Sequence, residues 1–256
     1  MVELEMRGVI SGKAGSMARA RASSSNGLVE RELGKRLKEV QTEFGADAFT
    51  YFGEIAYGAD SQVRGAVERL VEGRQKSEKL LVILETPGGY INIVERIVNI
   101  LRHYYSVIDF LIPDYAMSAG TVLALSGDAI HMDYYSVLGP IDPQVRRGNS
   151  GGFVSALGYL EQYNRLIEKS KQAALTDAEI NYLCDKFDPG ELYEYEQARE
   201  LSIDLLKKWL VDYKFKNWTT TAGRKLPVTR EIKEERATLI ASLLNDTRRW
   251  HSEAIR

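Results

Sequence analysis

Residues 79–90 read KLLVILETPGGY, and this segment decides the fold. Its first seven residues are almost all apolar, as in strands that are buried on both faces of a parallel sheet. The Thr-Pro-Gly-Gly turn ends the strand, and residues 90–104 continue with helical spacing through Ile93, Ile97 and Ile100. A buried strand followed by a turn and a helix predicts a βαβ unit.

The same order of strand, turn and helix recurs on both sides of this segment. Downstream, we expect a strand at 107–112 (VIDFLI), a helix at 117–126 and a short strand at 129–132. Upstream, we expect a helix at 28–44, a strand at 48–55 and a helix at 61–73. Helical patterns take over at 153–174, 177–186, 189–213 and 229–244. The alternation predicts an α/β fold. We expect a flexible arm rich in Ser, Gly, Ala and Arg at 1–27, an α/β catalytic core at 28–152 and a helical part at 153–256 that completes the site or mediates oligomerisation.

Composition excludes several classes of function. The 256 residues are 44% hydrophobic, enough for a sizeable core, and their 34 basic and 36 acidic side chains argue against a dedicated nucleic-acid binder. A single cysteine, Cys184, cannot form an internal disulfide. No apolar run approaches the ~18 residues of a membrane span, and the N-terminus lacks a secretory apolar region. We therefore expect a cytoplasmic protein. The sequence has no metal-ligand cluster, P-loop or dinucleotide motif, so we expect no cofactor and no metal.

Two turns follow buried strands, and ligands of parallel sheets bind at the carboxyl ends of strands. In the first, Gly88 and Gly89 permit positive φ angles, and their N–H groups could stabilise an oxyanion; the alternative is an ordinary turn. In the second, residues 113–121 read PDYAMSAGT, and Ser118 stands between small residues where a strand meets a helix. That position is typical of a nucleophile elbow, although a serine there can equally cap the helix.

The two turns together resemble the Clp protease/crotonase superfamily. With residues 129–144, AIHMDYYSVLGPIDPQ, the chain is similar to the serine dehydrogenase proteinase family, which is related to signal peptide peptidase A. The resemblance implies a Clp protease/crotonase-like repeated βαβ core that assembles into homo-oligomers. By position it implies Ser118 as the nucleophile and the backbone N–H groups of Gly89 and Ala119 as the oxyanion hole, with Gly88 as an accessory.

The general base is the point at which the families differ. Asp142 occupies the position at which Clp proteases have their histidine. His103 lies in an expected helix and His131 in an expected strand, and a structural role is the simpler interpretation of both. His251 lies near the C-terminus. A Ser-His-Asp triad is therefore disfavoured. Asp142 could orient a base, contact substrate or cap the turn before Pro143.

Signal peptide peptidases use a lysine instead, and Lys169 and Lys171 fall in the matching window. Helical spacing places Lys171 on the apolar face with Ile167, and a lysine in a desolvated site loses proton affinity. We expect Lys171 to be the base, with Lys169 as the alternative, and either could simply be a surface lysine. Tyr90 and Tyr115 border the two turns and could line a substrate cleft or only pack.

These observations predict a serine endopeptidase that acts on peptide or protein substrates. Two alternatives stay open. One is an acyl-thioester enzyme of the crotonase type, which would use the same oxyanion geometry. The other is a Clp-like scaffold without catalytic activity, favoured by the missing histidine.

Overall fold

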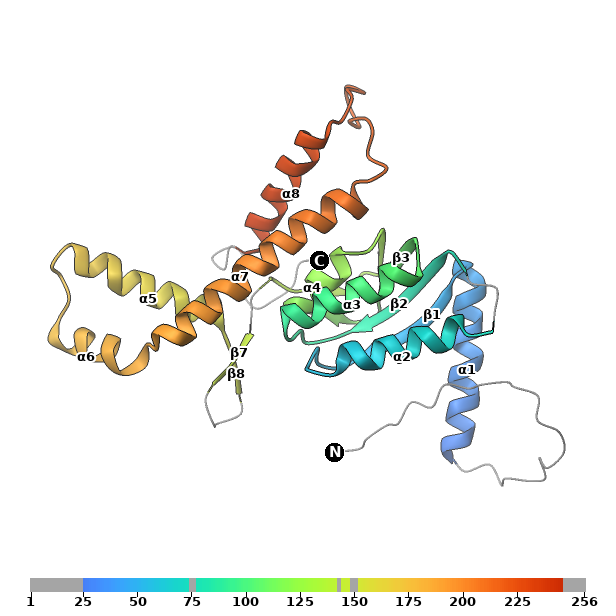
Figure 1. The fold of residues 1–256 in the computed structure, drawn as a ribbon, viewed down its shortest axis with the longest axis horizontal. Helices are drawn as coiled ribbons and strands as arrows, with labels where there is room; N and C mark the ends of the chain where they lie inside the picture. Colours follow the sequence, from blue (N-terminus) through green and yellow to red (C-terminus); the bar gives the residue numbers. More distant parts are fainter. Residues whose placement is uncertain (1–24, 74–76, 142–143, 148–151, 246–256) are drawn as a thin grey trace.

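The computed structural model describes residues 25–73, 77–141, 144–147 and 152–245 (Figure 1). Its centre is a four-stranded sheet in the order β1 (Asp47–Phe52), β2 (Lys79–Glu85), β3 (Val107–Ile112) and β5 (Ala129–Met132), and every neighbouring pair is parallel. Parallel neighbours require crossover connections, and helices supply them. The predicted α/β fold is confirmed.

Helices cover the two faces of the sheet unequally. On one face lie α2 (Ala59–Val71), α3 (Ile91–Tyr104) and α4 (Ala119–Leu125), which pack against Leu80, Val82 and Leu84 of β2. On the other face, α1 (Ser25–Phe44) is the one helix of the described chain that packs against the sheet. Its Leu37, Val40 and Phe44 side chains lie against Leu81. Because successive side chains of a strand point to opposite faces, the nearly unbroken apolar run of β2 serves both layers.

The rest of the chain is mostly helical and projects from the sheet (Figure 1). A hairpin of β7 (Gln144–Arg147) and β8 (Gly152–Ser155) leads into α5 (Ala156–Lys171), α6 (Asp177–Lys186) and α7 (Pro189–Trp209), followed by a π-helical turn, η2 (Leu210–Lys214), and α8 (Arg230–Leu244). We call α5, α6 and the first half of α7, residues 156–198, the helical extension.

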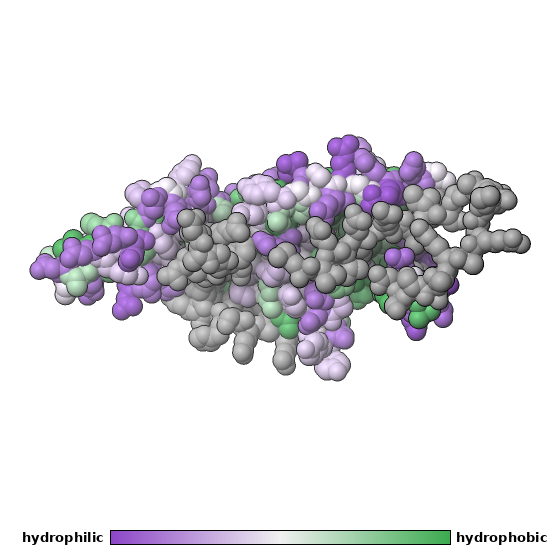
Figure 2. Space-filling view, turned by 90° about the horizontal axis from the view of Figure 1, so that it is seen from below, coloured by the Kyte–Doolittle hydropathy of each residue, from purple (hydrophilic) through white to green (hydrophobic). Residues whose placement is uncertain are grey.

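Helix α7 joins the helical extension to the core. Its Leu192 and Tyr195 pack with Leu160 of α5 in a small separate cluster, whereas Leu206 and Trp209 are buried in the main core. At 1.5 Å per residue this helix is about 30 Å long, enough to span both regions. Figure 2, seen from below, shows an elongated molecule; the coloured part of this face is mostly hydrophilic, with apolar patches at the helical extension and also elsewhere.

Two features differ from the sequence-based expectation. A short parallel pair, β4 (Tyr115–Ala116) with β6 (Val137–Leu138), lies beside the sheet, and the pattern did not predict it. Phe153, which was expected to begin a helix, lies in β8, because pairing with β7 overrides the helical spacing there. Of the predicted arm 1–27, the described part is only residues 25–27, which belong to α1. Among the helices in the described ranges, none has the length and apolarity needed to cross a membrane.

Candidate active site

The turn after β2 and the turn before α4 lie side by side. The Thr86 N–H donates to the Tyr115 carbonyl over 3.1 Å, and the Met117 N–H donates to the Thr86 carbonyl over 3.0 Å. Thr86 and Ala116 thereby form an isolated parallel bridge beyond the ends of β2 and β3. Backbone hydrogen bonds thus fix two segments that are distant in the sequence against each other at the carboxyl edge of the sheet.

The first glycine of this turn touches the serine. Gly88 has φ +101°, and a Cβ added to it would lie 2.7 Å from the Met117 carbonyl oxygen and 2.8 Å from the Ser118 Cβ. Gly89 has φ +148°, and a Cβ there would lie 2.2 Å from the Ile55 carbonyl oxygen. Only glycine fits at either position, because a side chain would force the turn away from Ser118 or from Ile55.

Ser118 has a strained backbone at the start of α4. Its angles are φ 52° and ψ −122°, outside the regions that non-glycine residues ordinarily occupy, at a cost of about 1 to 3 kcal/mol. The side chain makes no capping hydrogen bond to the helix, so the interpretation of Ser118 as a simple N-cap does not hold. The residue is 3% exposed and lies against Gly88. A strained serine between a strand and a helix has the geometry of a nucleophile elbow.

The backbone amides around this serine differ in their hydrogen bonding. The Gly88 N–H donates to the Thr86 hydroxyl over 3.0 Å, and the Gly120 N–H to the Met117 carbonyl over 2.8 Å. Within the described part of the chain, the N–H groups of Gly89 and Ala119 donate to no protein acceptor. The amides of Gly89 and Ala119, one on each side of the Gly88–Ser118 contact, are therefore available to hydrogen-bond the oxygen of a bound substrate.

A third segment packs against the residues that directly precede Ser118. The Thr121 hydroxyl bridges the carbonyls of Ala116 and Gly139, each at 2.8 Å, and a Cβ on Gly139 would lie 2.3 Å from the Met117 Sδ. The Gly-Pro turn at 139–140 thus packs directly beneath Met117. Asp142, which follows it, lies outside the described residues, as does His251.

The structure does not bring the predicted base to this junction within one chain. Lys171 ends α5, its side chain is 63% exposed, and its Nζ pairs with Glu168 over 2.5 Å. Lys169 pairs with Glu179 of α6 over 2.6 Å. The apolar face that the helical spacing predicted for Lys171 is therefore absent at this end of α5. Figure 1 shows α5 in the helical extension, well away from α4.

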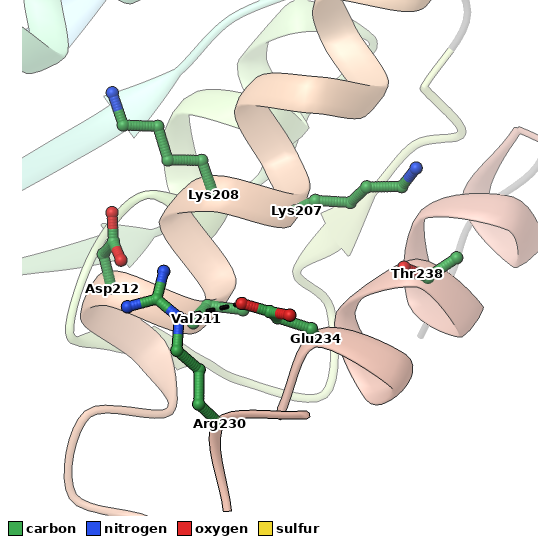
Figure 3. Close-up of a pocket in the computed structure, with 7 residues that line it drawn as sticks. All are labelled: Lys207, Lys208, Val211, Asp212, Arg230, Glu234 and Thr238. Carbon is green, nitrogen blue, oxygen red and sulfur yellow. Dashed lines mark hydrogen bonds and ion pairs between the residues drawn. The ribbon is translucent and has the colours of Figure 1, made fainter. Parts of the chain in front are cut away.

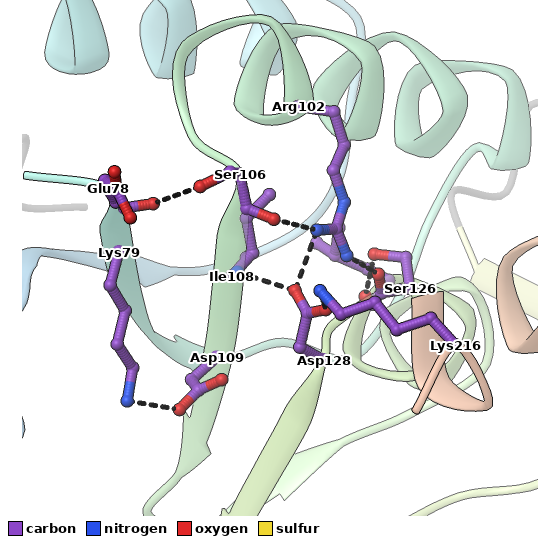
Figure 4. Close-up of polar contacts among 10 residues, drawn as sticks. Glu78, Lys79, Arg102, Ser106, Ile108, Asp109, Ser126, Asp128 and Lys216 are labelled. Atoms are coloured by element: carbon purple, nitrogen blue, oxygen red, sulfur yellow. Dashed lines mark hydrogen bonds and ion pairs between the residues drawn. The ribbon is translucent and has the colours of Figure 1, made fainter. Parts of the chain in front are cut away.

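His131 lies beside Asp109, whose ion pair with Lys79 is part of a charged cluster on the sheet (Figure 4). Its Nε2 lies 3.0 Å from Asp109 of β3, which also pairs with Lys79 over 2.8 Å. Burial would raise the pKa of the Asp109 carboxyl, but its hydrogen bonds with Lys79 and His131 outweigh this and hold the pKa below its ordinary value. The ring of Phe44 from α1 packs edge-on against His131. These contacts support the structural role expected of His131.

The second carboxyl of this cluster, Asp128, lies where the chain enters β5. It pairs with Arg102 over 2.8 Å and with Lys216, and it accepts the Ile108 N–H over 2.8 Å. These partners outweigh burial and hold the pKa of Asp128 below its ordinary value. Burial lowers the pKa of nearby Lys214 to about 8. This lysine faces Asp109 and Asp128 near the amino ends of the strands, at the opposite edge from Ser118, so it does not replace Lys171.

A cavity of about 450 Å³ lies between α7 and α8 (Figure 3). Its walls carry charges of both signs, and Arg230 and Glu234, one turn apart on α8, pair along one wall over 2.8 Å. The residues that line it are Lys207, Lys208, Val211, Asp212, Arg230, Glu234 and Thr238. None of them was expected in the site, and we assign the cavity no part in it. Among the described residues, no group of His, Cys, Asp and Glu side chains could hold a metal ion.

Two known proteins are similar to this chain in sequence. The chain is 32% identical over 154 residues, and 29% identical over 197, to two uncharacterised proteins of Methanocaldococcus jannaschii. These matches cover 57% and 72% of this chain and 52% and 64% of the relatives, so the chain spans only part of their length.

Two similar solved structures are both of a 1510-N membrane-bound stomatin-specific protease. One is a serine-to-alanine mutant at 16% identity, covering 72% of this chain and 92% of that one. The other is a lysine-to-alanine mutant with a substrate peptide, at 18% identity, covering 77% and 97%. Both have a TM-score of 0.38.

A family model identifies the chain more firmly. The model of ClpP-like SDH-type serine proteinases matches residues 59–241, which include both turns and the helical extension. That range is most of the chain. The protein belongs to the family of ClpP-like SDH-type serine proteinases.

Proposed function

We propose that this chain is a serine endopeptidase whose nucleophile is Ser118. The observation that carries the proposal is the junction itself: a strained serine lies against a diglycine turn, with two unbonded amides on either side of the contact. Family membership supports a serine peptidase; the roles of individual residues are our assignment. The substrate is a peptide or protein segment, and the chemistry needs no cofactor.

In the proposed mechanism the Ser118 hydroxyl attacks the scissile carbonyl carbon. The carbonyl oxygen becomes an oxyanion that accepts hydrogen bonds from the N–H groups of Gly89 and Ala119. In comparable sites the loss of one such donor lowers kcat by about 10²- to 10³-fold. A base takes the serine proton and then returns it to the leaving amine, which leaves an acyl-enzyme for water to hydrolyse.

We propose Lys171, supplied by a neighbouring copy of the chain, as the base. The helical extension carries Lys171 away from the Ser118 of its own chain, and its amine is exposed enough to meet another subunit. A base from a neighbour requires homo-oligomers. On binding, the amine would leave Glu168 and face the Ser118 hydroxyl of the neighbouring chain.

The first experiment tests the nucleophile. Purified protein is incubated with a small fluorophosphonate and with unstructured protein substrates, and the Ser118→Ala variant is compared with wild type. We expect wild type to be labelled and to hydrolyse peptide bonds, and Ser118→Ala to do neither while keeping its circular-dichroism spectrum. Hydrolysis that persists in Ser118→Ala would remove this residue from the mechanism. A folded wild-type protein without labelling or turnover would instead indicate a scaffold, and thioester turnover without labelling an acyl-thioester enzyme.

The second experiment tests where the base comes from. Ser118→Ala and Lys171→Ala are each expected to be inactive, and we expect their mixture to regain activity after subunit exchange, because a mixed oligomer contains one complete site. Lys169→Ala, on the same helix end, is expected to stay active, and an inactive Lys169→Ala with an active Lys171→Ala would make Lys169 the base instead. If the mixture stays inactive while mixed oligomers form, a base from the neighbour is excluded.

A further inference from the structure

A loop that the mechanism does not use is fastened to the diglycine turn. In the loop between β1 and α2, the Ile55 N–H donates to the Gly88 carbonyl over 2.8 Å, and the Ile55 carbonyl accepts from the Tyr90 N–H over 2.9 Å. Ile55 is fully buried beneath this contact. The loop therefore holds a fixed position against the same turn that touches Ser118.

The loop presents a tyrosine ring beside that turn. The ring of Tyr57 lies 4.6 Å from the ring of Tyr90, centroid to centroid, with an angle of 36° between the planes. Tyr90 is half-buried and packs against the core, whereas Tyr57 is 71% exposed. One side of the Tyr57 ring covers Tyr90, so its exposed fraction offers the remaining aromatic surface to solvent. Because the Tyr57 ring is mostly exposed, packing in the core does not account for an aromatic residue at this position.

The backbone that carries Tyr90 lies close to the nucleophile. Gly88 touches Ser118, and Tyr90 is two residues further along, a span of at most about 7 Å. An extended peptide advances about 3.3 Å per residue. The ring pair is therefore within reach of a substrate side chain one or two residues from the carbonyl that Ser118 would attack.

We propose that Tyr57 and Tyr90 form a subsite that takes an aromatic side chain of the substrate, next to or one residue away from the scissile bond. The inference rests on the proposed peptidase function and adds the class of substrate side chain to it. An aromatic ring gains both apolar burial and ring–ring contact on an exposed tyrosine, whereas a saturated ring of the same shape gains only burial. A cation could also lie over the ring, so the test below includes arginine.

The test uses the full chain and short peptidyl phosphonates that label the active serine. The two residues nearest the phosphorus are varied in turn among phenylalanine, cyclohexylalanine, alanine and arginine, and labelling rates are expressed relative to a small fluorophosphonate. At one of the two positions we expect phenylalanine to exceed alanine by about 10-fold or more and cyclohexylalanine by about 2- to 10-fold.

Variants assign that preference to the ring pair. Tyr57→Ala is expected to remove the preference for phenylalanine over cyclohexylalanine, Tyr57→Phe to keep it, and Tyr193→Ala to keep it as a matched control, because Tyr193 is a 63% exposed tyrosine on the distant helical extension. A preference that is unchanged in Tyr57→Ala, or a preference for arginine, would overturn the subsite.

A binding measurement separates this inference from the proposed function. Fluorescent peptides with phenylalanine or alanine at the selective position are titrated into Ser118→Ala protein, with and without Tyr57→Ala, and anisotropy is recorded. Tighter binding of the phenylalanine peptide that depends on Tyr57 supports the subsite even if the wild type proves not to hydrolyse peptides. Equal binding of both peptides contradicts the subsite whatever the chemistry of Ser118.

Discussion

The proposed site takes residues from two regions that are built differently. One is the junction between the two turns, and the other is the helical extension. At the junction, Thr86 and Gly88 are buried and held by backbone hydrogen bonds between distant segments, and the buried Ser118 directly follows Met117, whose N–H donates to Thr86. In the helical extension, a small cluster around Leu160 packs α5 against the start of α7, and Lys171 is exposed. The nucleophile and its amides are thus positioned by the chain itself, whereas the base is not. This difference leads us to place the base in a neighbouring subunit.

The largest effect is expected from filling the diglycine turn. Gly89→Ala places a Cβ 2.2 Å from the Ile55 carbonyl oxygen at φ +148°, so the turn must move and the Gly89 amide with it. We expect fluorophosphonate labelling to fall by about 10²-fold or more. The matched control is Gly53→Ala, which has φ +124° but nothing within 4 Å of the added Cβ. Equal losses in both variants would mean that backbone strain, not the contact with Ile55, governs the turn.

A second comparison concerns stability in the two regions. Leu84→Ala removes a fully buried side chain from the core and is expected to lower the free energy of unfolding by about 2 to 5 kcal/mol. Leu160→Ala removes a side chain from the small cluster of the helical extension. Here we expect local loss of amide-exchange protection in α5 and α6 with the core transition unchanged. If both variants lower one common transition equally, the two regions unfold as a unit.

A third prediction concerns the hydrogen bond that orders the first turn. Thr86→Val keeps the shape of a fully buried side chain but removes the acceptor of the Gly88 N–H. An unsatisfied buried donor costs about 1 to 3 kcal/mol, measurable by urea unfolding. Thr238→Val, at an exposed position on α8, is the control and should stay within about 0.5 kcal/mol of wild type. A neutral Thr86→Val would show that this hydrogen bond does not hold the turn.

The last prediction is a dependence of stability on pH that belongs to the core. Burial lowers the pKa of Lys214 to about 8 from an ordinary 10.5, so the unfolded chain binds more protons between these values. Stability should therefore rise as the pH increases from about 8 to 10.5, and Lys214→Met should abolish this rise. The carboxyls of Asp109 and Asp128 have lowered pKa values, so their contribution is present above pH 3.8 and is lost as the pH falls below it. Asp109→Asn should reduce the loss in acid.

The sequence predicted the elements whose burial follows directly from local pattern. The strands at 79–85, 107–112 and 129–132 have the expected bounds because apolar runs define them. The helix at 177–186 also has its expected bounds, with Thr176 and Glu179 forming a capping box at its start. The expected strand at 48–55 ends earlier, at Phe52, because Gly53 turns the chain with φ +124°.

What the sequence could not predict depends on contacts between distant segments. The two-residue strands β4 and β6 exist only because they pair, and no local pattern marks them. The sequence suggested Ser118 and the glycines, but not that Thr86 fastens the turns or that Tyr57 lies beside Tyr90. The helical spacing predicted a buried face for Lys171, but α5 ends at that residue and leaves it in solvent.

The most direct test of the account is a crystal structure of the protein after reaction with a peptidyl phosphonate. We predict that the phosphorus is bonded to the Ser118 Oγ and that one phosphonyl oxygen lies about 2.7 to 3.1 Å from the N–H groups of both Gly89 and Ala119. A phosphonyl oxygen directed away from both amides, or an adduct on any other residue, would contradict the account.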